Sequence, residues 1–580
     1  MMKTISELIP RSWRTTGIPL VLLSVIVWAT FGQLARNELT FDDLDTIKNN
    51  QAITTLRNLP LLFSPQYFQR FDEFSYRPVC TLSYFLDHAI AGKRPWIYHL
   101  HNVAFHHLNV LLVFALFHLL GAGLWRSFAT ALIFAVHPLQ TEAVIFPGFR
   151  EDLQMTAGML VMSCCLVSDR RGSGAGWVIG ATMALGYGLF AKEGALVLPA
   201  AWWIGDLLYG RTAVHRLGLC RRYILLVLVL LFYVLIRFAV MANPAAAGME
   251  VIEPSPLGQR LLTAPYLFAY YLRRFLWPLP LCIIAGLGPL KSAGPIFYLS
   301  LLVCAAFVVL WVMLARREPW LWLAGLWVGA TFLPVSNIYP IINLWAERFY
   351  YSVGVGMAAI AVAAIVALWE RLTEDVEETR RLGLAIGGWI LIGFLAWGAA
   401  ILDVGRILQC RTSLSLWRET VRVVPTNGLA LGTLAKYELD AGNYDHVERL
   451  APALERYDPW IFRANLILGE NASRQGRWEE AIKYYEKARS VPPASPQLGT
   501  SVTLGLAKGY QMIGQRERAV TILRQALQQN PGSLPIQNLL HQFETKPAAA
   551  PTTTSAVIQP AETKPSAAPT TVPASTQRAP

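Results

Sequence analysis

Apolar stretches of roughly 16–21 residues recur through this chain as far as residue 403, and a helix of that length crosses the ~30 Å hydrocarbon core of a bilayer. Hydrophobic residues make up 54% of the 580 residues and charged residues only 15%, which excludes an ordinary soluble domain. We therefore expect an all-α, polytopic membrane helix bundle with about eleven transmembrane helices. The expected spans are about 17–35, 100–120, 128–147, 153–168, 175–191, 195–210, 223–241, 295–315, 319–338, 350–369 and 384–403.

The Lys and Arg residues between these spans predict the orientation. Every basic cluster falls on one side of the expected topology, and the positive-inside rule makes that side the cytoplasm, together with the N-terminus. The chain after residue 404 then lies on the extracytoplasmic side. The net charge of +12 follows from this topology and indicates no nucleic-acid partner. The loops expected to face outward are 36–99, 148–152, 242–294 and 339–349.

After residue 404 the sequence becomes amphipathic and repetitive. Gly442, Gly476 and Gly514 lie 34 and 38 residues apart, and a proline follows each glycine by 17 residues. Glycine at the turn, small residues where two helices cross and proline after the second helix resemble the tetratricopeptide repeat. We expect about three such units over 405–545, with a concave face that holds a peptide. A structural cap on the membrane domain is the alternative.

Residues 546–580 are rich in Ala, Pro and Thr and contain too few large apolar residues to build a core. We expect this tail to be disordered, either as a plain flexible end or with Ser and Thr hydroxyls that are themselves glycosylated. The predicted organisation is thus a membrane domain over 1–404, repeats over 405–545 and the tail.

Two adjacent carboxylates, Asp42 and Asp43, lie just past the first span. Carboxylates beside a bilayer are costly unless they are solvated or used, so the pair indicates either a reactive site or an ordinary wet loop. Asp43 and Asp45 also form an Asp-x-Asp pattern, which binds a divalent ion in some glycosyltransferases. The chain has 7 cysteines and 10 histidines, but none has the spacing of a metal site, and we expect the histidines to bond between helices.

The other outward corners combine acids and bases, as in Lys192-Glu193 and Glu347-Arg348. A carboxylate that accepts a proton, with cations nearby, suits transfer of a group from a phosphate-bearing lipid. The base deprotonates an acceptor hydroxyl, and Arg or Lys stabilises the departing phosphate. The alternative is that these residues form structural ion pairs or extend toward the membrane surface.

Several motifs occur in one order along the membrane domain. They are Phe41-Asp42-Asp43, Tyr76-Arg77-Pro78, Tyr98-His99-Leu100, His137-Pro138 with Thr141-Glu142-Ala143, Gly148-Phe149-Arg150, Lys192-Glu193-Gly194 and Ala346-Glu347-Arg348. Over about residues 15–405 this series resembles the transmembrane and tetratricopeptide-repeat-containing O-mannosyltransferases, which are GT-C glycosyltransferases. The eukaryotic members carry long repeat arrays, so the short array here suggests a prokaryotic relative.

The resemblance implies a GT-C fold with its active site at the external face and inverting transfer of a sugar from a polyprenyl-phosphate donor. It implies that Asp42 is the base, with Asp43 as its partner or alternative. From their placement, the expected ligands of the donor phosphate are Arg77, Arg150, Lys192 and Arg348. The residues expected to contact the sugar or to support these groups are His99, His137, Glu142, Glu193 and Glu347.

Two functions follow from these features. The first is an enzyme that moves a hexose, mannose-like by resemblance, from a polyprenyl phosphate to a hydroxyl, with the repeats recruiting a protein or peptide acceptor. The second is a non-enzymatic membrane scaffold that presents the repeats for assembly of an envelope complex. The many titratable groups on one face favour the enzyme. Membrane lipids are expected partners in both cases, and no cofactor beyond an optional divalent ion is expected.

Overall fold

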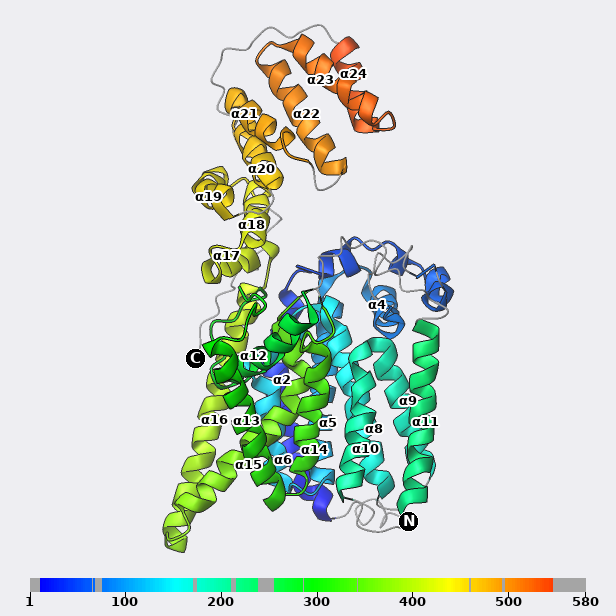
Figure 1. The fold of residues 1–580 in the computed structure, drawn as a ribbon, viewed down its shortest axis with the longest axis vertical. Coiled ribbons are helices and arrows are strands. Elements are labelled where there is room, and N and C mark those ends of the chain that lie inside the picture. Colours follow the sequence, from blue (N-terminus) through cyan, green and yellow to red (C-terminus); the bar gives the residue numbers. More distant parts are fainter. Residues whose placement is uncertain are drawn as a thin grey trace, which may run out of the picture. The chain divides into compact units, whose positions relative to one another are not determined.

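The computed structural model describes residues 11–64, 66–67, 76–170, 175–209, 215–237, 255–284, 286–341, 343–457, 461–492 and 496–545. Every regular element within these ranges is a helix, which confirms the all-α expectation (Figure 1). The chain forms two compact units, Met1–Ala441 and Gly442–Pro580. Helices α17 (Ser413–Val423) and α18 (Gly428–Asp440), which we assigned to the repeats, belong to the first unit. The predicted tail lies outside the described residues.

A helix lies over each expected span. Among the described residues, 5 helices are long and apolar enough to cross a membrane, or 6 if a pair bent by 56° after Val136 counts as one. These helices support an integral membrane protein. Fewer of them meet the criteria for a complete span than the eleven expected. Their bounds are α2 Arg11–Phe31, α5 Pro95–Leu119, α6 Leu124–Val136, α7 Thr141–Ile145, α8 Arg150–Arg170, α9 Ala175–Ala191, α10 Leu198–Tyr209, α11 His215–Leu235, α13 Pro295–Arg317, α14 Leu321–Phe332, α15 Tyr350–Leu372 and α16 Glu378–Gln409.

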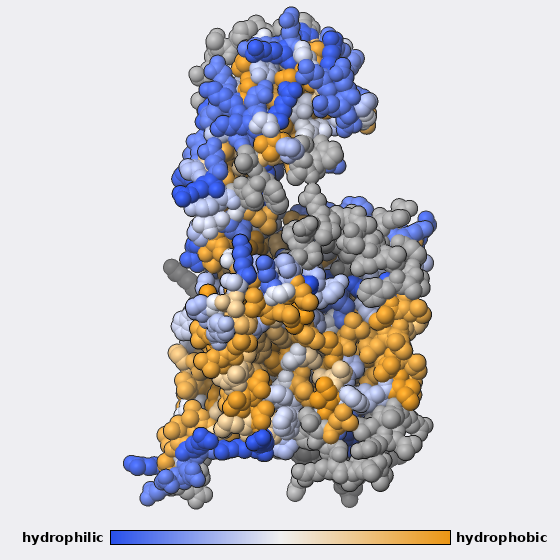
Figure 2. Space-filling view, viewed as in Figure 1, coloured by the Kyte–Doolittle hydropathy of each residue, from blue (hydrophilic) through white to orange (hydrophobic). Residues whose placement is uncertain are grey.

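The outward surface of these helices is apolar, and Figure 2 shows hydrophobic side chains gathered over the helical part of the first unit. In α13 only 11% of the most apolar 18-residue stretch is buried, and in α16 none of it is. A soluble protein would bury such side chains, whereas a bilayer core solvates them. The exposed apolar surface therefore agrees with a membrane environment.

Inside the bundle, α8 and α9 approach each other closely. A Cβ atom at Gly158 on α8 would lie 2.7 Å from the carbonyl oxygen of Ala184 and 2.9 Å from Cα of Gly188, both on α9. Only glycine permits two helix backbones this near to each other. The contact fixes α9 against α8, and Lys192 just after α9 reaches Asp152 in the first turn of α8.

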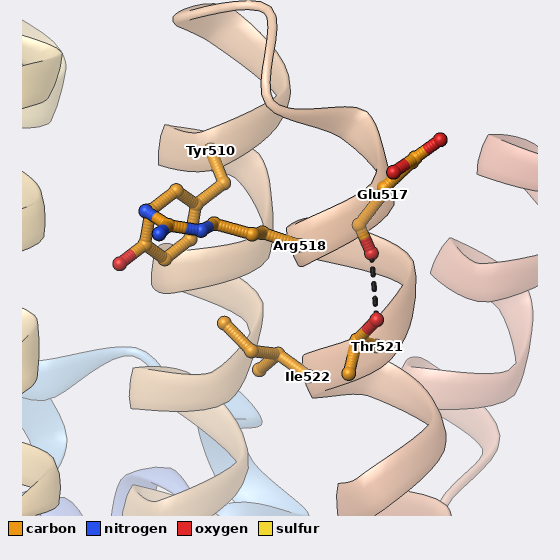
Figure 3. Close-up of a pocket in the computed structure, with 5 residues that line it drawn as sticks. All are labelled: Tyr510, Glu517, Arg518, Thr521 and Ile522. Atoms are coloured by element: carbon orange, nitrogen blue, oxygen red, sulfur yellow. Dashed lines mark hydrogen bonds between the residues drawn. The ribbon is translucent and has the colours of Figure 1, made fainter.

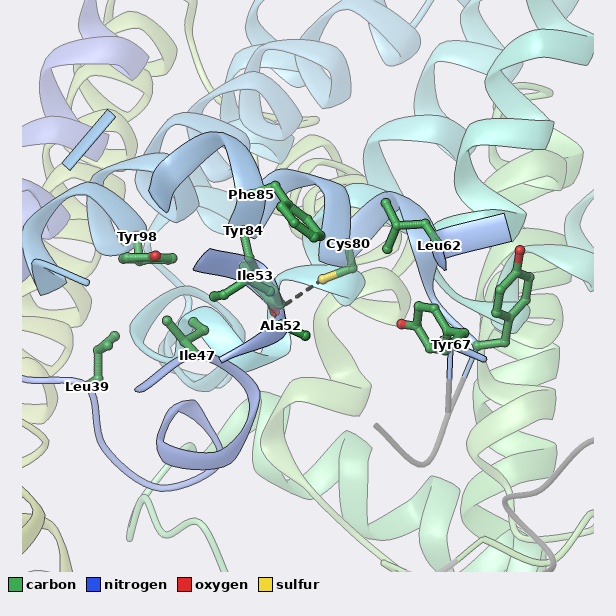
Figure 4. Packing of buried hydrophobic residues seen from close by; sticks show 11 residues of the cluster. Leu39, Ile47, Ala52, Ile53, Leu62, Tyr67, Cys80, Tyr84, Phe85 and Tyr98 are labelled. Atoms are coloured by element: carbon green, nitrogen blue, oxygen red, sulfur yellow. Dashed lines mark hydrogen bonds between the residues drawn. The ribbon is translucent and has the colours of Figure 1, made fainter. Parts of the chain in front are cut away.

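The loop after α2 is a packed structure. It contains the short helices η2 (Leu44–Lys48), η3 (Ala52–Thr54) and η4 (Leu56–Phe63), which lie beside α4 (Pro78–Ala91). Figure 4 shows the buried side chains that these elements share with the start of α5, including a contact of 3.2 Å from Cys80 Sγ to Tyr84 Oη. Burial of this apolar surface holds these short helices against α4 and α5. The residues of this core include Leu39, Ile47, Ile53, Leu62, Phe85 and Tyr98.

Helix α12 (Leu257–Leu276) lies within 242–294, which we expected to be an outward-facing loop. It does not meet the criteria for a spanning helix. Its buried residues Thr263, Leu267, Tyr271 and Arg274 recur every three or four positions, so one face packs against the unit while Arg273 is exposed. This two-sided pattern favours a helix that lies along the membrane surface.

The second unit consists of paired helices. Gly476 and Gly514 have φ values of 75° and 81°, the left-handed conformation in which glycine ends a helix at a turn. Tyr485 packs where Gly469 and Gly505 leave room, since a Cβ atom there would lie 2.7 Å and 2.5 Å from its ring. These are the small-residue crossings expected of the repeats. The helices are α19 Tyr444–Tyr457, α20 Ile461–Arg474, α21 Trp478–Arg489, α22 Pro496–Met512, α23 Arg516–Gln529 and α24 Leu534–Thr545.

An open pocket of about 280 Å³ lies between α22 and α23 in this unit (Figure 3). The guanidinium of Arg518 lies 5.9 Å from the ring centre of Tyr510, and Thr521 Oγ1 donates a hydrogen bond of 2.8 Å to the Glu517 carbonyl. The first contact joins α22 to α23, and the second lies within one turn of α23. The pocket is therefore a crevice of the repeat surface, without a cluster of reactive groups.

Candidate active site

The first loop places Asp43 at a fixed position. Its Oδ1 accepts a hydrogen bond of 2.6 Å from the Gly148 backbone N–H, and its Oδ2 accepts one of 3.1 Å from the Thr40 N–H. A Cβ atom at Gly148 would lie 3.1 Å from Asp43 Oδ1, so glycine allows this approach. Burial raises the pKa of the Asp43 carboxyl, and the two N–H donors oppose that rise. Asp43 is thus a buried anchor of the loop.

Asp42, in contrast, is exposed. No group in the described part of the chain donates a hydrogen bond to its carboxylate or forms an ion pair with it. Partial burial raises its pKa from 3.8 to about 6, Arg348 opposes the rise, and nearby Glu151 and Glu142 add to it. Asp42 therefore sits close to both acids and a cation, with its oxygens available.

The backbone beside this pair is strained. Phe41 has a φ of 55°, a left-handed conformation that a bulky side chain rarely adopts. Its ring lies 5.8 Å from that of Phe146 and 5.9 Å from that of Trp417, which compensates by burying the aromatic surface. Strain of this kind persists where the surrounding structure over-determines it, often at functional sites.

Arg348 and Glu142 form one side of the site. Arg348 Nη1 lies 2.6 Å from Glu142 Oε1, and the Arg348 backbone N–H donates a 3.0 Å hydrogen bond to Glu142 Oε2. The guanidinium carbon lies 3.9 Å from the ring centre of Phe149. The pair joins η11 (Glu347–Phe349) to α7, and it holds the cation in one orientation.

Arg77 and Lys192 form a second group of cations, around the first turn of α8. Arg77 Nη1 lies 2.8 Å from Glu151 Oε1, and Lys192 Nζ lies 2.7 Å from both oxygens of Asp152. Lys192 is also 3.7 Å from Glu151. Two cations and two carboxylates thus form a network, and Asp42 lies within electrostatic reach of Glu151.

Glu193 belongs to the rim of this network. Its Oε2 lies 3.6 Å from Nη1 of Arg237, which is near the end of α11. Burial would raise the pKa of Glu193, but the charges of Arg77 and Arg237 outweigh it, so the pKa lies below 4.5. Glu193 therefore stays ionised and balances the cations.

Arg150 lies apart from these cations, because its side chain is fully buried. It lies 2.6 Å from Asp87, and it donates hydrogen bonds to Asn102, Ser83 and the Tyr98 carbonyl at 2.7, 2.8 and 2.9 Å. All three guanidinium nitrogens have partners. Arg150 therefore joins α4, α5 and α8 behind the site.

The two predicted histidines contact backbone rather than one another. His99 lies between the carbonyls of Ile145 and Glu38, at 3.0 and 3.2 Å. His137 accepts from the Leu139 N–H through Nδ1, and its Nε2 lies 2.9 Å from the Phe275 carbonyl. Both rings hold segments that frame the site.

Glu347 is fully buried beside a region that the sequence analysis did not single out. Its Oε1 accepts a 2.8 Å hydrogen bond from the Cys282 N–H and lies 3.3 Å from Arg274. The charge of Arg406 on α16 also acts on it, one turn after Asp403. Charged residues near the end of an apolar span are candidates for a functional role. By that criterion the sequence alone could have identified Asp403 and Arg406.

The residues suggested for a divalent ion do not fit one. Both Asp43 oxygens already accept backbone hydrogen bonds, and Asp45 points to Asn49 at 3.5 Å. A search of the described ranges finds no group of three or more His, Cys, Asp or Glu residues arranged around a metal position. We derive no step through a metal.

Comparisons with known proteins agree with the sequence motifs. Residues 502–533 match the family described as "Tetratricopeptide repeat". The chain is 34% identical over 181 residues to protein O-mannosyl-transferase TMTC2 of Homo sapiens, covering 29% of this chain and 21% of the relative. It is 24% identical over 473 residues to protein O-mannosyl-transferase F38B6.6 of Caenorhabditis elegans, covering 76% and 64%. The resemblance to these O-mannosyltransferases is confirmed.

The match to these curated relatives spans about a fifth to just under two thirds of their lengths. Among solved structures, the chain is similar to ArnT from Cupriavidus metallidurans bound to undecaprenyl phosphate. That similarity has a TM-score of 0.37 and 14% identity, and it covers 90% of this chain and 81% of the other.

Proposed function

We propose that this protein is an inverting membrane glycosyltransferase of the GT-C type. It moves a hexose, most simply mannose, from a polyprenyl phosphate to a hydroxyl group, such as a Ser or Thr of a protein. The reaction takes place at the extracytoplasmic face, with the N-terminus in the cytoplasm and the repeats outside. The names of the relatives support a sugar transferase, and the open carboxylate of Asp42, within electrostatic reach of Arg348 and Glu151, carries the proposal.

In this proposal Asp42 is the general base. The acceptor oxygen forms a bond to the anomeric carbon of the sugar while the bond from that carbon to the phosphate oxygen breaks. The acceptor proton moves to Asp42, and the polyprenyl phosphate leaves with the bonding electron pair. A pKa raised to about 6 suits a base that works near neutral pH. Attack opposite to the leaving group inverts the configuration.

Arg348, Lys192 and Arg77 stabilise the negative charge on the departing phosphate. Each is held by a carboxylate, so each is oriented before the donor binds. Each retains N–H groups that its carboxylate does not use, because Lys has three donors and Arg has five. We leave Arg150 out of this set, because its fully buried guanidinium is already occupied.

The repeats have the separate task of presenting the acceptor. A stack of helix pairs offers an extended surface for a polypeptide, and the family match at 502–533 supports that use here. The transfer site itself lies in the first unit. The division of the chain into two units therefore corresponds to a division between chemistry and acceptor recruitment.

The test is transfer of radiolabelled sugar from polyprenyl-phosphate mannose by the purified full chain in a cell-envelope extract. We expect label in protein with the wild type, a loss of about 10²–10⁴-fold in Asp42→Asn, and near-normal transfer in Asp45→Asn, the matched exposed carboxylate of the same loop. Full activity in both Asp42→Asn and Asp43→Asn would reject the mechanism. Failure of the wild type with several lipid-linked sugars would favour the scaffold.

A further inference from the structure

Buried polar atoms without partners gather beside the candidate site. More than a third of the buried side-chain nitrogen and oxygen atoms that lack a hydrogen-bond partner within the described ranges belong to one group of residues. All five side chains are buried, with at most 5% of any residue exposed. These residues, named the inner polar cluster here, are Gln140, Trp345, Glu347, Tyr350 and Arg406.

Several elements bring the inner polar cluster together. The segment η5 (Pro138–Gln140) packs against α15 and α16, and Gly354 leaves room for the Gln140 side chain beside the Tyr350 ring. Arg274 links Glu347 at 3.3 Å to the ring of Trp345 at 5.7 Å. Arg406 acts electrostatically on Glu347 and on Glu142.

The cluster offers a mixture of hydrogen-bonding groups. Arg406 and Trp345 are donors, Glu347 is an acceptor, and Gln140 and the Tyr350 hydroxyl are both. A phosphate needs donors alone, a metal ion needs acceptors alone, and a polyprenyl chain needs neither. A sugar has hydroxyls that donate and accept at once, together with C–H groups that pack on aromatic rings. The composition therefore matches a polyhydroxylated ligand.

Leaving so many groups unpaired is costly, since each buried donor or acceptor without a partner costs about 1–3 kcal/mol. We propose that the inner polar cluster is the subsite that binds the sugar headgroup of the lipid donor, an inference that rests on the proposed function. Glu142 connects it to the transfer site, because Glu142 pairs with Arg348 and feels the charge of Arg406.

The decisive experiment compares two lipids. The purified full chain in nanodiscs is titrated with polyprenyl phosphate and with polyprenyl-phosphate mannose, for the wild type, Gln140→Leu and Arg406→Met. We expect the affinity for the sugar-bearing lipid to fall about tenfold in each variant, while the affinity for the sugarless lipid stays within about twofold. The thermal stability of Gln140→Leu should be unchanged or higher, because an unpartnered polar group is replaced by an apolar one of similar size.

Asp206→Leu is the matched control. Asp206 is also a buried polar residue of the first unit, but it is paired with Arg170 and accepts a 2.7 Å hydrogen bond from Tyr223 Oη. Its replacement should lower thermal stability and leave the ratio of the two affinities unchanged. The contrast separates loss of a sugar contact from damage to the fold.

Four outcomes would overturn the subsite. Equal losses for both lipids would assign the cluster a structural role, and unchanged affinities would mean that water alone satisfies these atoms. A wild type that transfers sugar but whose variants keep normal discrimination would remove the subsite and leave the proposed function intact. A wild type that binds and transfers no lipid-linked sugar would remove both.

Discussion

The Asp43 carboxylate accepts a 2.6 Å hydrogen bond from the backbone N–H of Gly148, 105 residues further along the chain. This bond joins the first loop to η6 (Pro147–Phe149), directly before α8. Because Asp42 precedes Asp43, the bond also fixes the backbone of the residue whose carboxylate is open. In the mechanism that we propose, the two neighbouring aspartates thus have different tasks, one in positioning and one in reaction.

The first prediction follows from that difference. Asp43→Asn replaces one acceptor by an NH₂ group that faces an N–H donor, so we expect a loss of about 1–3 kcal/mol in stability and at least a tenfold lower kcat. The acid limb of the pH profile should persist, because Asp42 still titrates. Kinetics across pH and thermal unfolding of the full chain check this. Disappearance of the limb would identify Asp43 as the base.

The pH dependence is the second prediction. Burial raises the pKa of Asp42 to about 6, and the base works only when ionised. Transfer should therefore be level above about pH 7 and fall roughly tenfold per unit below about pH 6. Arg348 lowers this pKa, so Arg348→Gln should move the limb to higher pH as well as reduce the rate. A limb that stays in place would show that Arg348 does not act on Asp42.

The third prediction concerns the donor phosphate. Lys192→Gln removes the cation that lies 2.7 Å from Asp152 and leaves that carboxylate to repel the phosphate. We expect about tenfold or more weaker binding of polyprenyl phosphate, measured by titration in nanodiscs. The control is Arg126→Gln. Arg126 lies at the start of α6 and pairs with Glu318 and Glu370, so its replacement should leave lipid binding unchanged.

Independence from metal is the fourth prediction. Each Asp43 oxygen already accepts a backbone hydrogen bond, and within the described residues no group of three possible ligands includes Asp43 or Asp45, so we expect chelation to leave transfer unchanged. Activity after exhaustive EDTA dialysis, with and without added Mg²⁺ or Mn²⁺, measures this directly. A loss restored by the ion would place ligands outside the pair named here.

The fifth prediction separates the two units. Tyr485 fills the space left by Gly469 and Gly505, so Tyr485→Ala should destabilise the repeats by about 3–5 kcal/mol. Transfer to a folded protein acceptor should then fall while transfer to a short Thr-containing peptide persists. Hydrogen exchange of the full chain would locate the change in α20–α23. Equal losses for both acceptors would contradict separate tasks.

Much of the fold could be predicted because its signals are local. Apolar length predicted a helix over every span, and the regular glycines predicted the repeat turns that Gly476 and Gly514 form. The first motif drew attention to Asp42, whose open carboxylate agrees with the role we propose. These features depend on neighbouring residues, so sequence patterns report them well.

The pairings could not be predicted, because they join distant segments. Nothing near Arg150 in the sequence indicates that Asp87 and Asn102 surround it, and the same holds for Arg348 and Glu142. The bend after Val136 also shortens what reads as one apolar span, since His137-Pro138 interrupts the helix. From the sequence alone, a cation that is free to bind phosphate could therefore not be distinguished from one that forms a structural ion pair.

The exposed apolar surface of α16 connects the candidate site to the surrounding lipid. This helix carries Asp403 and Arg406 near one end, yet none of its most apolar stretch is buried by protein. The lipid therefore supplies most of the free energy that sets how deep the helix sits. A bilayer that is thinner or thicker than the helix shifts it at a modest cost per ångström. We expect turnover to depend on acyl-chain length, so that membrane composition acts as an effector of this protein.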